Sequence, residues 1–360
     1  MRIDIGAKRR FALEIRQRIS WQRQAVILGL AMLCGMAISA AILMAAGVSA
    51  ENLLNEFVIQ TFFDAQNVQA VLFQAAPMIM IGLAAALAFR VRFWNLGLEG
   101  QMIWGAIGAT AVSILEIGPD GTRLALMFTA AALAGLLWVL GPAVLKLKLG
   151  VNEIISTLML NYVASNFLLH MLYGAWKDPK SSFPHSPQFR GFERLPEFAT
   201  GFSSAILIGL VVAAMVWWLT DVSRAGLYMR FVYANRRMAE AMGVAVSRVM
   251  LGSVLASGAL GGIAGFVVAA GQEGRLTQGF FQGYGFSGIL IAFLARNHPI
   301  AAAIVAVLVA GLFVTGRTLQ VFYQIPFAMV QLIQAIIVIC VAASEFFIRH
   351  RVHRVAVSQR

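Results

Sequence analysis

The sequence predicts an all-helical polytopic membrane protein with about ten spans. Hydrophobic residues make up 60% of the 360 residues and charged residues only 12%, which excludes an ordinary soluble domain. The apolar residues gather into long uncharged stretches. Most of the 28 Lys and Arg residues fall on alternate connections between these stretches. Because Lys and Arg near span ends resist translocation, this asymmetry predicts a multi-pass chain with a defined orientation.

Each predicted span follows from an uncharged stretch, since about 20 apolar residues are needed to cross about 30 Å of hydrocarbon. The stretches 100–115, 283–295 and 300–316 are short, and we expect them to be tilted, broken or re-entrant. The first stretch is longer than a signal-peptide core and follows a basic segment, which favours a retained span. In order, the stretches are 25–47, 68–89, 100–115, 124–145, 154–173, 202–220, 249–271, 283–295, 300–316 and 326–344.

Charge divides the chain into three parts: a basic segment at 1–24, a transmembrane domain at 25–348 and a basic tail at 349–360. Both terminal segments belong to the Lys- and Arg-rich set, so both termini are expected in the cytoplasm. The net charge of +12 would suggest nucleic acid in a soluble protein. Beside membrane spans, it instead predicts contact with anionic lipid headgroups and no nucleic-acid partner.

Two connections are long enough to carry structure. Residues 174–201, on the outer side, hold four prolines and balanced charge, which suits either a structured cap or docking surface, or a solvated connector. Residues 221–248, on the inner side, carry five arginines. Within this inner loop, 235–242 is predicted to form a short surface helix, with Asn235 as its N-cap and Gly243 just past its end. The alternative is a basic tether at the membrane surface.

The centres of the predicted spans contain no Asp, Glu, Lys or Arg, and we expect Glu99 and Glu153 at cytoplasmic ends. Ion-coupled transporters place such groups at mid-membrane, so ion coupling is disfavoured. The chain has no GxxxxGK[ST] phosphate loop and is not expected to be an enzyme. Its two cysteines, Cys34 and Cys340, form no metal-ligand spacing, so we expect neither a metal nor a cofactor.

Two polar motifs open helices at predicted inner ends. Asn95-Leu96-Gly97-Leu98-Glu99-Gly100-Gln101 begins the third span, and Val151-Asn152-Glu153-Ile154-Ile155-Ser156-Thr157 begins the fifth. Capping by Asn, with a carboxylate in the first helical turn, explains both motifs. Alternatively, polar side chains of the two motifs line a path through the membrane; the candidates are Glu99, Gln101, Asn152, Ser156, Thr157 and Asn161.

Three segments in this order and spacing, NLGLEGQM, VNEIISTLMLNY and GFSGILIAFLARNHP, resemble permease subunits of bacterial ABC importers. The resemblance covers about residues 70–345 and is to the ribose and branched-chain amino-acid class, within it to the nucleoside branch. It implies an inner-membrane subunit that translocates a nucleoside or related neutral solute. The implied partners are a cytoplasmic ABC ATPase, a second permease and an extracytoplasmic solute-binding protein.

The resemblance also assigns the inner loop. The family has a Gly-Ala-Asn-Pro-Arg-like run there, and this chain has Tyr233-Ala234-Asn235-Arg236-Arg237, without the Gly and Pro. By the resemblance, this helix docks into a groove of the ATPase and transmits its closure. The implied coupling residues are Asn235, Arg236, Arg237, Ala239, Glu240 and Gly243.

Three alternatives remain. Gly285-Phe286-Ser287-Gly288 matches the GxSG of intramembrane serine proteases, but a nucleophile needs a base within reach, and His298 follows at the opposite end of the same short span. No catalytic residue is therefore expected. A passive channel or secondary transporter is the second alternative. The third is an ABC permease for simple sugars or branched-chain amino acids.

Overall fold

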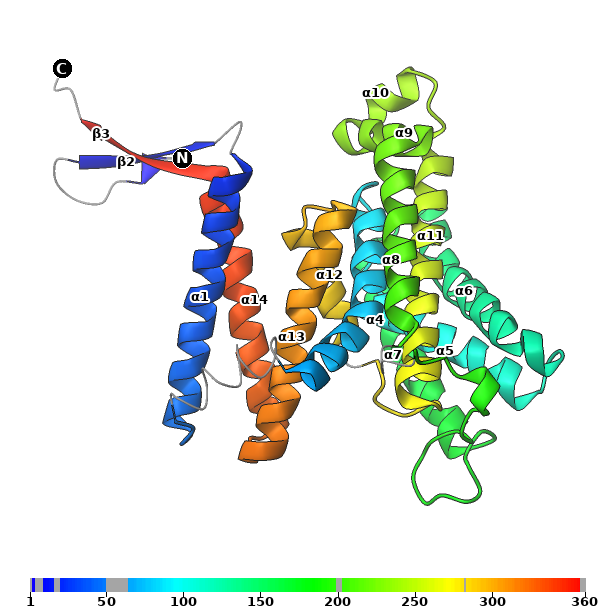
Figure 1. Ribbon diagram of the computed structural model, residues 1–360. Helices are drawn as coiled ribbons and strands as arrows, with labels where there is room; N and C mark the ends of the chain where they lie inside the picture. Colours follow the sequence, from blue (N-terminus) through cyan, green and yellow to red (C-terminus); the bar gives the residue numbers. More distant parts are fainter. Residues whose placement is uncertain are drawn as a thin grey trace. The chain divides into compact units, whose positions relative to one another are not determined.

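The computed structural model describes residues 2–3, 9–15, 20–49, 64–198, 203–281 and 283–356. Parts of both predicted terminal segments, residue 202 of one predicted span, and residues 199–201 of the 174–201 connection lie outside these ranges. One helix corresponds to each predicted span (Figure 1): α1 (Trp21–Ala45), α4 (Ala65–Phe89), α5 (Leu98–Ile114), α6 (Asp120–Val144), α7 (Glu153–Tyr173), α8 (Ala205–Trp217), α11 (Val246–Val267), α12 (Tyr284–Leu294), α13 (Pro299–Tyr323) and α14 (Phe327–Arg349).

Helix length separates full spans from partial ones. Within the described residues, eight helices are long and apolar enough to cross a membrane. The other two are α5, with 17 residues, and α12, with 11, which agrees with the short stretches predicted there. The prediction that 300–316 is short is wrong, because α13 has 25 residues. Arg317 ends the uncharged stretch but does not end the helix.

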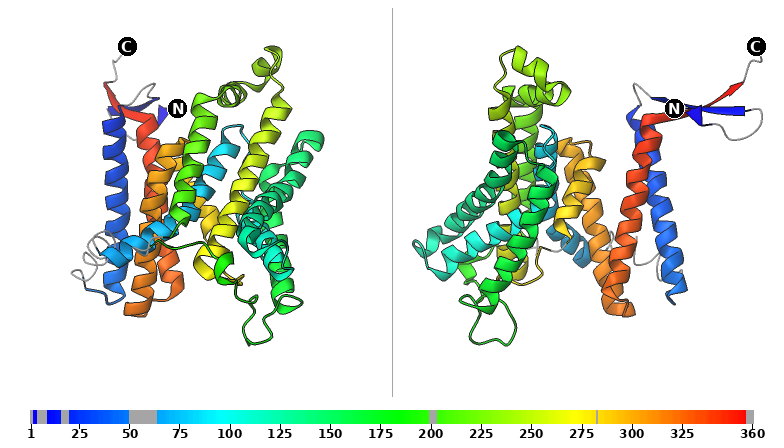
Figure 2. Two further views of the ribbon diagram at one scale, coloured as in Figure 1. Left: turned by 45° about the vertical axis from the view of Figure 1, so that its right-hand side comes forward. Right: turned by 180° about the vertical axis from the view of Figure 1, so that it is seen from behind.

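The chain divides into two compact units. Unit 1 comprises Met1–Gln60 and Thr315–Arg360. In it α1 and α14 lie side by side (Figures 1 and 2), and a Cβ on Gly35 would come within 2.9 Å of the Ile337 Cα. The strands β1 (Arg2–Ile3), β2 (Arg9–Ile15) and β3 (His350–Ala356) form an antiparallel sheet that pairs Ile15 with His350. The two ends of the described chain therefore lie on the same side of unit 1.

Unit 2, Thr61–Val314, is built around α4 and α11. The α4 side chains from Gln74 to Phe89 are all buried, as expected for a helix that is apolar on every face. Glycines let α5, α6 and α11 approach at backbone distance. A Cβ on Gly105 would lie 2.2 Å from the Gly262 carbonyl oxygen, and one on Gly262 would lie 2.1 Å from that of Ala131. Small residues at such contacts are how helices pack where the solvent is lipid.

We expect Gly262→Ala to destabilise unit 2, because the added methyl group meets backbone that cannot move aside. Overpacking of this kind costs about 1–3 kcal/mol. The control is Gly252→Ala on the same helix, since a Cβ there has no neighbour within 4 Å. Heating detergent extracts and measuring the monodisperse fraction should show a lower midpoint for Gly262→Ala only. Equal midpoints for the two variants would contradict this packing.

The ends of unit 2 differ. Residues 174–198 project from one end, and α9 (Arg224–Ala234) and α10 (Arg236–Ala241) from the other (Figures 1 and 2). The 174–198 segment is structured, because the Phe189 N–H donates to the Gly274 carbonyl at 2.8 Å and the Ser186 N–H to that of Leu276 at 3.0 Å. Its Glu193 is buried and pairs with Arg123 at 3.1 Å. Of the two predicted alternatives, the solvated connector is wrong for this part.

Candidate functional site

The chain is not helical between α4 and α5. After Phe89 it follows an irregular course to Gly97, the N-cap of α5, and Arg92 adopts a left-handed φ of 56°. The predicted cap Asn95 therefore stands two residues before the actual one. Irregular backbone within a helical membrane domain must find hydrogen-bond partners in the protein. The polar residues of both sequence motifs supply those partners.

Asn95 and Gln101 form a reciprocal amide pair: Asn95 Nδ2 donates to Gln101 Oε1 at 3.2 Å, and Gln101 Nε2 donates back to Asn95 Oδ1 at 3.0 Å. Asn95 Nδ2 also donates to Ser257 Oγ of α11 at 3.1 Å. From α7, Thr157 Oγ1 accepts from the Leu96 N–H at 3.2 Å. This network fixes the interruption to α7 and α11.

Asn161 completes the attachment to α7. Its Oδ1 accepts from the Gly100 N–H and its Nδ2 donates to the Leu96 carbonyl, both at 2.8 Å. One amide side chain thus satisfies a donor and an acceptor on opposite sides of the α5 start. A Cβ on Gly100 would lie 2.9 Å from Asn161 Oδ1, so glycine is needed at this position.

The interruption lies at mid-level in unit 2. The α11 helix and its extension η5 (Val268–Glu273) run continuously from Val246 to Glu273. Ser257, which binds Asn95, and Gly261, which Gln101 contacts, are near the midpoint of that run. The prediction that Glu99 lies at a cytoplasmic end is therefore wrong. Glu99 brings a carboxyl group to the middle of the helical layer, which was predicted to contain no charged group.

Glu99 meets the start of α12. Its carboxyl group lies beside the backbone of Gly283 and Gly285, and a Cβ on Gly285 would lie 2.4 Å from Glu99 Cγ. A carboxylate at a helix N-terminus satisfies unpaired N–H groups and interacts well with the helix dipole. Glu99, on α5, thus serves the first turn of another helix. We call residues 95–101 and 283–285 the mid-level junction.

From this junction α5 and α12 run in opposite directions. Near the end of α5, Ser113 Oγ donates to Glu193 of the 174–198 segment at 2.8 Å. The α12 helix instead follows α4: Gln74 Nε2 donates to Tyr284 Oη at 2.9 Å, and the rings of Phe89 and Phe293 lie 5.2 Å apart. Two short helices therefore begin at the same level, and each reaches one end of unit 2.

Arg90 joins three elements at the α9–α10 end. Its Nε donates to the Asn297 carbonyl beyond α12 at 3.0 Å, and its Nη1 donates to the Thr220 carbonyl at 3.2 Å. It also pairs with Asp221 at 3.4 Å, and Arg230 of α9 approaches the same carboxylate at 2.7 Å. Burial lowers the pKa of the Arg90 guanidinium, and the Asp221 carboxylate opposes that shift.

The predicted surface helix exists as α10. Asn235 Oδ1 accepts from the Met238 N–H at 3.2 Å, which is the expected N-cap, and Gly243 adopts a φ of 80° just past the end. Ala239 is buried, whereas Met238 and Met242 are each 63% exposed. Arg236 and Glu240 form an exposed ion pair at 3.3 Å. We call the exposed side of this helix the α10 surface.

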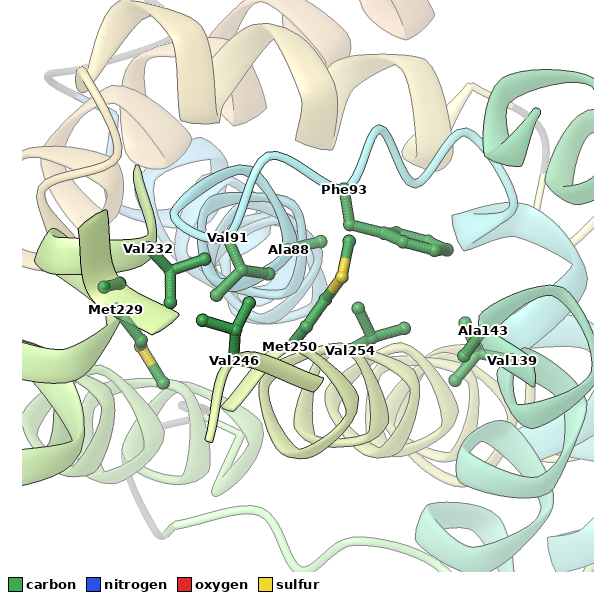
Figure 3. Close-up of a cluster of buried hydrophobic side chains, with 11 residues drawn as sticks. Ala88, Val91, Phe93, Val139, Ala143, Met229, Val232, Val246, Met250 and Val254 are labelled. Atoms are coloured by element: carbon green, nitrogen blue, oxygen red, sulfur yellow. The ribbon is translucent and has the colours of Figure 1, made fainter. Parts of the chain in front are cut away.

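Ala239 connects α10 to a buried hydrophobic cluster. The cluster includes Val232 of α9, Val246 and Met250 of α11, and Val91 and Phe93 just before the mid-level junction (Figure 3). Phe93 lies two residues from Asn95. A packed path of side chains therefore leads from α10 to the junction.

The other predicted site residues have local roles. Asn152 Oδ1 caps α7 by accepting from the Ile154 N–H at 2.9 Å, and Ser156 Oγ donates to the Glu153 carbonyl at 3.2 Å. Gln101 and Thr157 are each only 1% exposed. In the GxSG match that sequence analysis argued against, Ser287 Oγ donates to the carbonyl of Gly283, the N-cap of α12, at 2.6 Å. The capping alternative thus holds for Asn152. Sequence analysis did not predict the structural contacts of Arg90, Asp221 and Ser257.

Comparison with known proteins decides the family. Residues 67–342 match the family described as branched-chain amino acid transport system, permease component. The chain belongs to this permease family. The permease is 32% identical to the glucose ABC transporter permease protein TsgB13 of Haloferax volcanii over 90% of this chain and 88% of that protein. It is 30% identical to the guanosine permease NupP of Bacillus subtilis, over 88% and 92%.

A third relative is the nucleoside permease NupB of Lactococcus lactis, 25% identical over 89% of this chain and 91% of that protein. The permease is accordingly a multi-pass membrane subunit of an ABC importer, located in the bacterial inner membrane. The mid-level junction and the α10 surface are the parts of the permease that call for a functional explanation.

Proposed function

We propose that this permease translocates a nucleoside into the cytoplasm, with α9, α10 and both termini on the cytoplasmic side. The observation that carries the proposal is the full-length similarity to permeases named for guanosine and for nucleosides. The glucose permease, at 32% identity, favours a simple sugar as the second candidate. Both kinds of solute are neutral, in keeping with helices whose apolar stretches carry few charges.

The proposed partners follow from two features of the chain: its sequence has no ATPase phosphate loop, and its α10 surface is exposed. We propose that ATP is hydrolysed by a separate cytoplasmic ATPase subunit, which grips the α10 surface. The exposed Met238 and Met242 offer flexible apolar contacts, and Arg237 offers charge beside them. A second permease completes the solute route, and a solute-binding protein docks at the opposite end, on the 174–198 segment.

Packing supports a mechanical link between ATPase and route. When the ATPase moves α10, Ala239 carries the displacement into the hydrophobic cluster that includes Val91 and Phe93. Phe93 lies two residues before Asn95, and the amide pair of Asn95 with Gln101 holds the start of α5. Arg90 links the same end to the residues beyond α12. The short helices α5 and α12 would therefore shift together. This shift would open the mid-level junction toward one end of unit 2.

Uptake measurements separate the two candidate solutes. In cells that lack their own nucleoside uptake systems, co-expression of the permease with its ATPase and binding protein should give saturable uptake of labelled guanosine. Excess unlabelled adenosine should compete, and excess glucose should not. Uptake of labelled glucose that guanosine leaves unaffected would contradict the nucleoside assignment and support the sugar.

A further inference from the structure

Helix α7 combines low apolarity with high exposure. It is the least apolar of the eight candidate spans and, with α1, the least buried. A helix whose exposed side faces lipid is expected to be strongly apolar, because polar side chains that face hydrocarbon cost free energy. The polar part of the exposed side of α7 should therefore face something other than lipid in the assembled transporter, whereas Ile155, Met159 and Val163 give the same helix an exposed apolar part.

Four exposed residues define what we call the polar face of α7: Tyr162, Asn166, His170 and Tyr173. Their spacing of four, four and three residues places them on one side of the helix. Tyr162 and Tyr173 are 62% and 64% exposed. At 1.5 Å per residue the polar face extends about 16 Å, roughly half of the hydrocarbon thickness. It occupies the half of α7 that leads to the 174–198 segment.

Large apolar side chains are exposed on α6, on α8 and on the part of α7 that holds Ile155 and Met159. On α6 the exposed large side chains include Leu133 and Leu137, and on α8 they include Leu207 and Leu210. Such surfaces suit lipid. The contrast indicates that the polarity of α7 has a local cause.

We propose that the polar face of α7 lines the water-filled solute route and contacts a planar ring that forms hydrogen bonds, as a nucleobase does. Two phenol rings can stack on such a ring. An amide and an imidazole can donate to and accept from its edge. The identity of the solute in this inference rests on the proposed nucleoside function. The exposure of the polar face to water does not depend on that function.

A second permease fits the polar face less well than a solute does. Helices within this protein meet through Gly105, Gly135 and Gly262, where backbones touch. Tyr162 and Tyr173 project far from the α7 backbone and prevent such an approach. Thr157 and Asn161, from the motif that predicted a path, instead turn inward to bind Leu96 and Gly100. The route-lining side of α7 is thus the side that the motif did not mark.

Single cysteines test exposure to water. In the full transporter, with Cys34 and Cys340 replaced by alanine, one cysteine is placed at position 162, 166 or 170 and treated with a charged, membrane-impermeant thiosulfonate. Matched controls are cysteines at Leu133 and Leu137 on α6. We expect labelling several-fold faster on the polar face, slowed by guanosine. Rates no faster than those of the controls would overturn the polar face as a route lining, even where guanosine transport is intact.

Ring contact has its own test. Tyr162→Leu should raise the half-saturating guanosine concentration about tenfold, since loss of one stacking contact costs about 1–3 kcal/mol. Tyr162→Phe keeps the ring and should change the half-saturating guanosine concentration much less. Equal values for the two variants would contradict stacking. Protection of the cysteines by glucose and not by guanosine would contradict the nucleoside and leave the water-filled route in place.

Discussion

Glu99→Leu is expected to reduce uptake more than tenfold, because it removes the carboxylate that holds the start of α12. The backbone N–H groups of Gly283 and Gly285 would lose the carboxylate that lies beside them. Each unsatisfied buried donor costs about 1–3 kcal/mol, and about 1.4 kcal/mol corresponds to a factor of ten. Glu99→Gln keeps one acceptor oxygen and should lose less. The measurement is the initial rate of labelled solute uptake at equal amounts of assembled transporter.

The matched control is Glu116→Leu. Glu116 lies just beyond the other end of α5 and forms an exposed ion pair with Arg190. Exposed pairs contribute about 0–1 kcal/mol, so this variant should transport almost normally. If Glu99→Leu transports as well as Glu116→Leu, the carboxylate does not hold the mid-level junction together.

Arg237→Glu combined with Gly243→Leu is expected to separate ATP hydrolysis from uptake. Both positions are exposed at α10. A Cβ on Gly243 has no neighbour within 4 Å, but its φ of 80° strains any larger residue, so the leucine both adds bulk to the proposed ATPase contact and disturbs the end of α10. Charge reversal at a central interface residue commonly costs about 2 kcal/mol or more. Uptake per ATP hydrolysed should fall about tenfold or more. Insertion of the chain in the membrane should not change.

The chain offers a paired control for this double variant. Arg248→Glu with Gly252→Leu makes the same charge reversal and adds the same bulk on α11, at exposed positions where a Cβ on Gly252 also has open space, so it matches charge and bulk but not the strain at Gly243. That variant should couple hydrolysis to uptake normally. Equal losses in the two double variants would show that the α10 surface is not the contact with the ATPase.

Local patterns predicted the helices well. Runs of apolar residues mark every long helix, and Asn235 and Gly243 mark α10, because caps and hydrophobic stretches are properties of short segments. The exception at α13 has the same origin: a charge such as Arg317 ends an uncharged stretch, but a helix continues through it.

The depth of Glu99 could not be predicted in the same way. Charge places Arg90 and Arg92 at a membrane surface, and Glu99 follows them closely in sequence. The chain returns to mid-level within those few residues because Thr157, Asn161 and Ser257 satisfy its backbone and its polar side chains. Those partners come from α7 and α11, far away in sequence. Only the folded structure shows that polar residues of the two sequence motifs form hydrogen bonds with each other.

The most direct test of this account is transport by purified components in sealed vesicles. Vesicles that contain the permease with its ATPase and binding protein should concentrate labelled guanosine when hydrolysable ATP is supplied on the ATPase side. Vesicles that contain the permease alone, or the complex with a non-hydrolysable ATP analogue, should not. Accumulation against a gradient by the permease alone would contradict the claim that a separate ATPase drives transport through this permease.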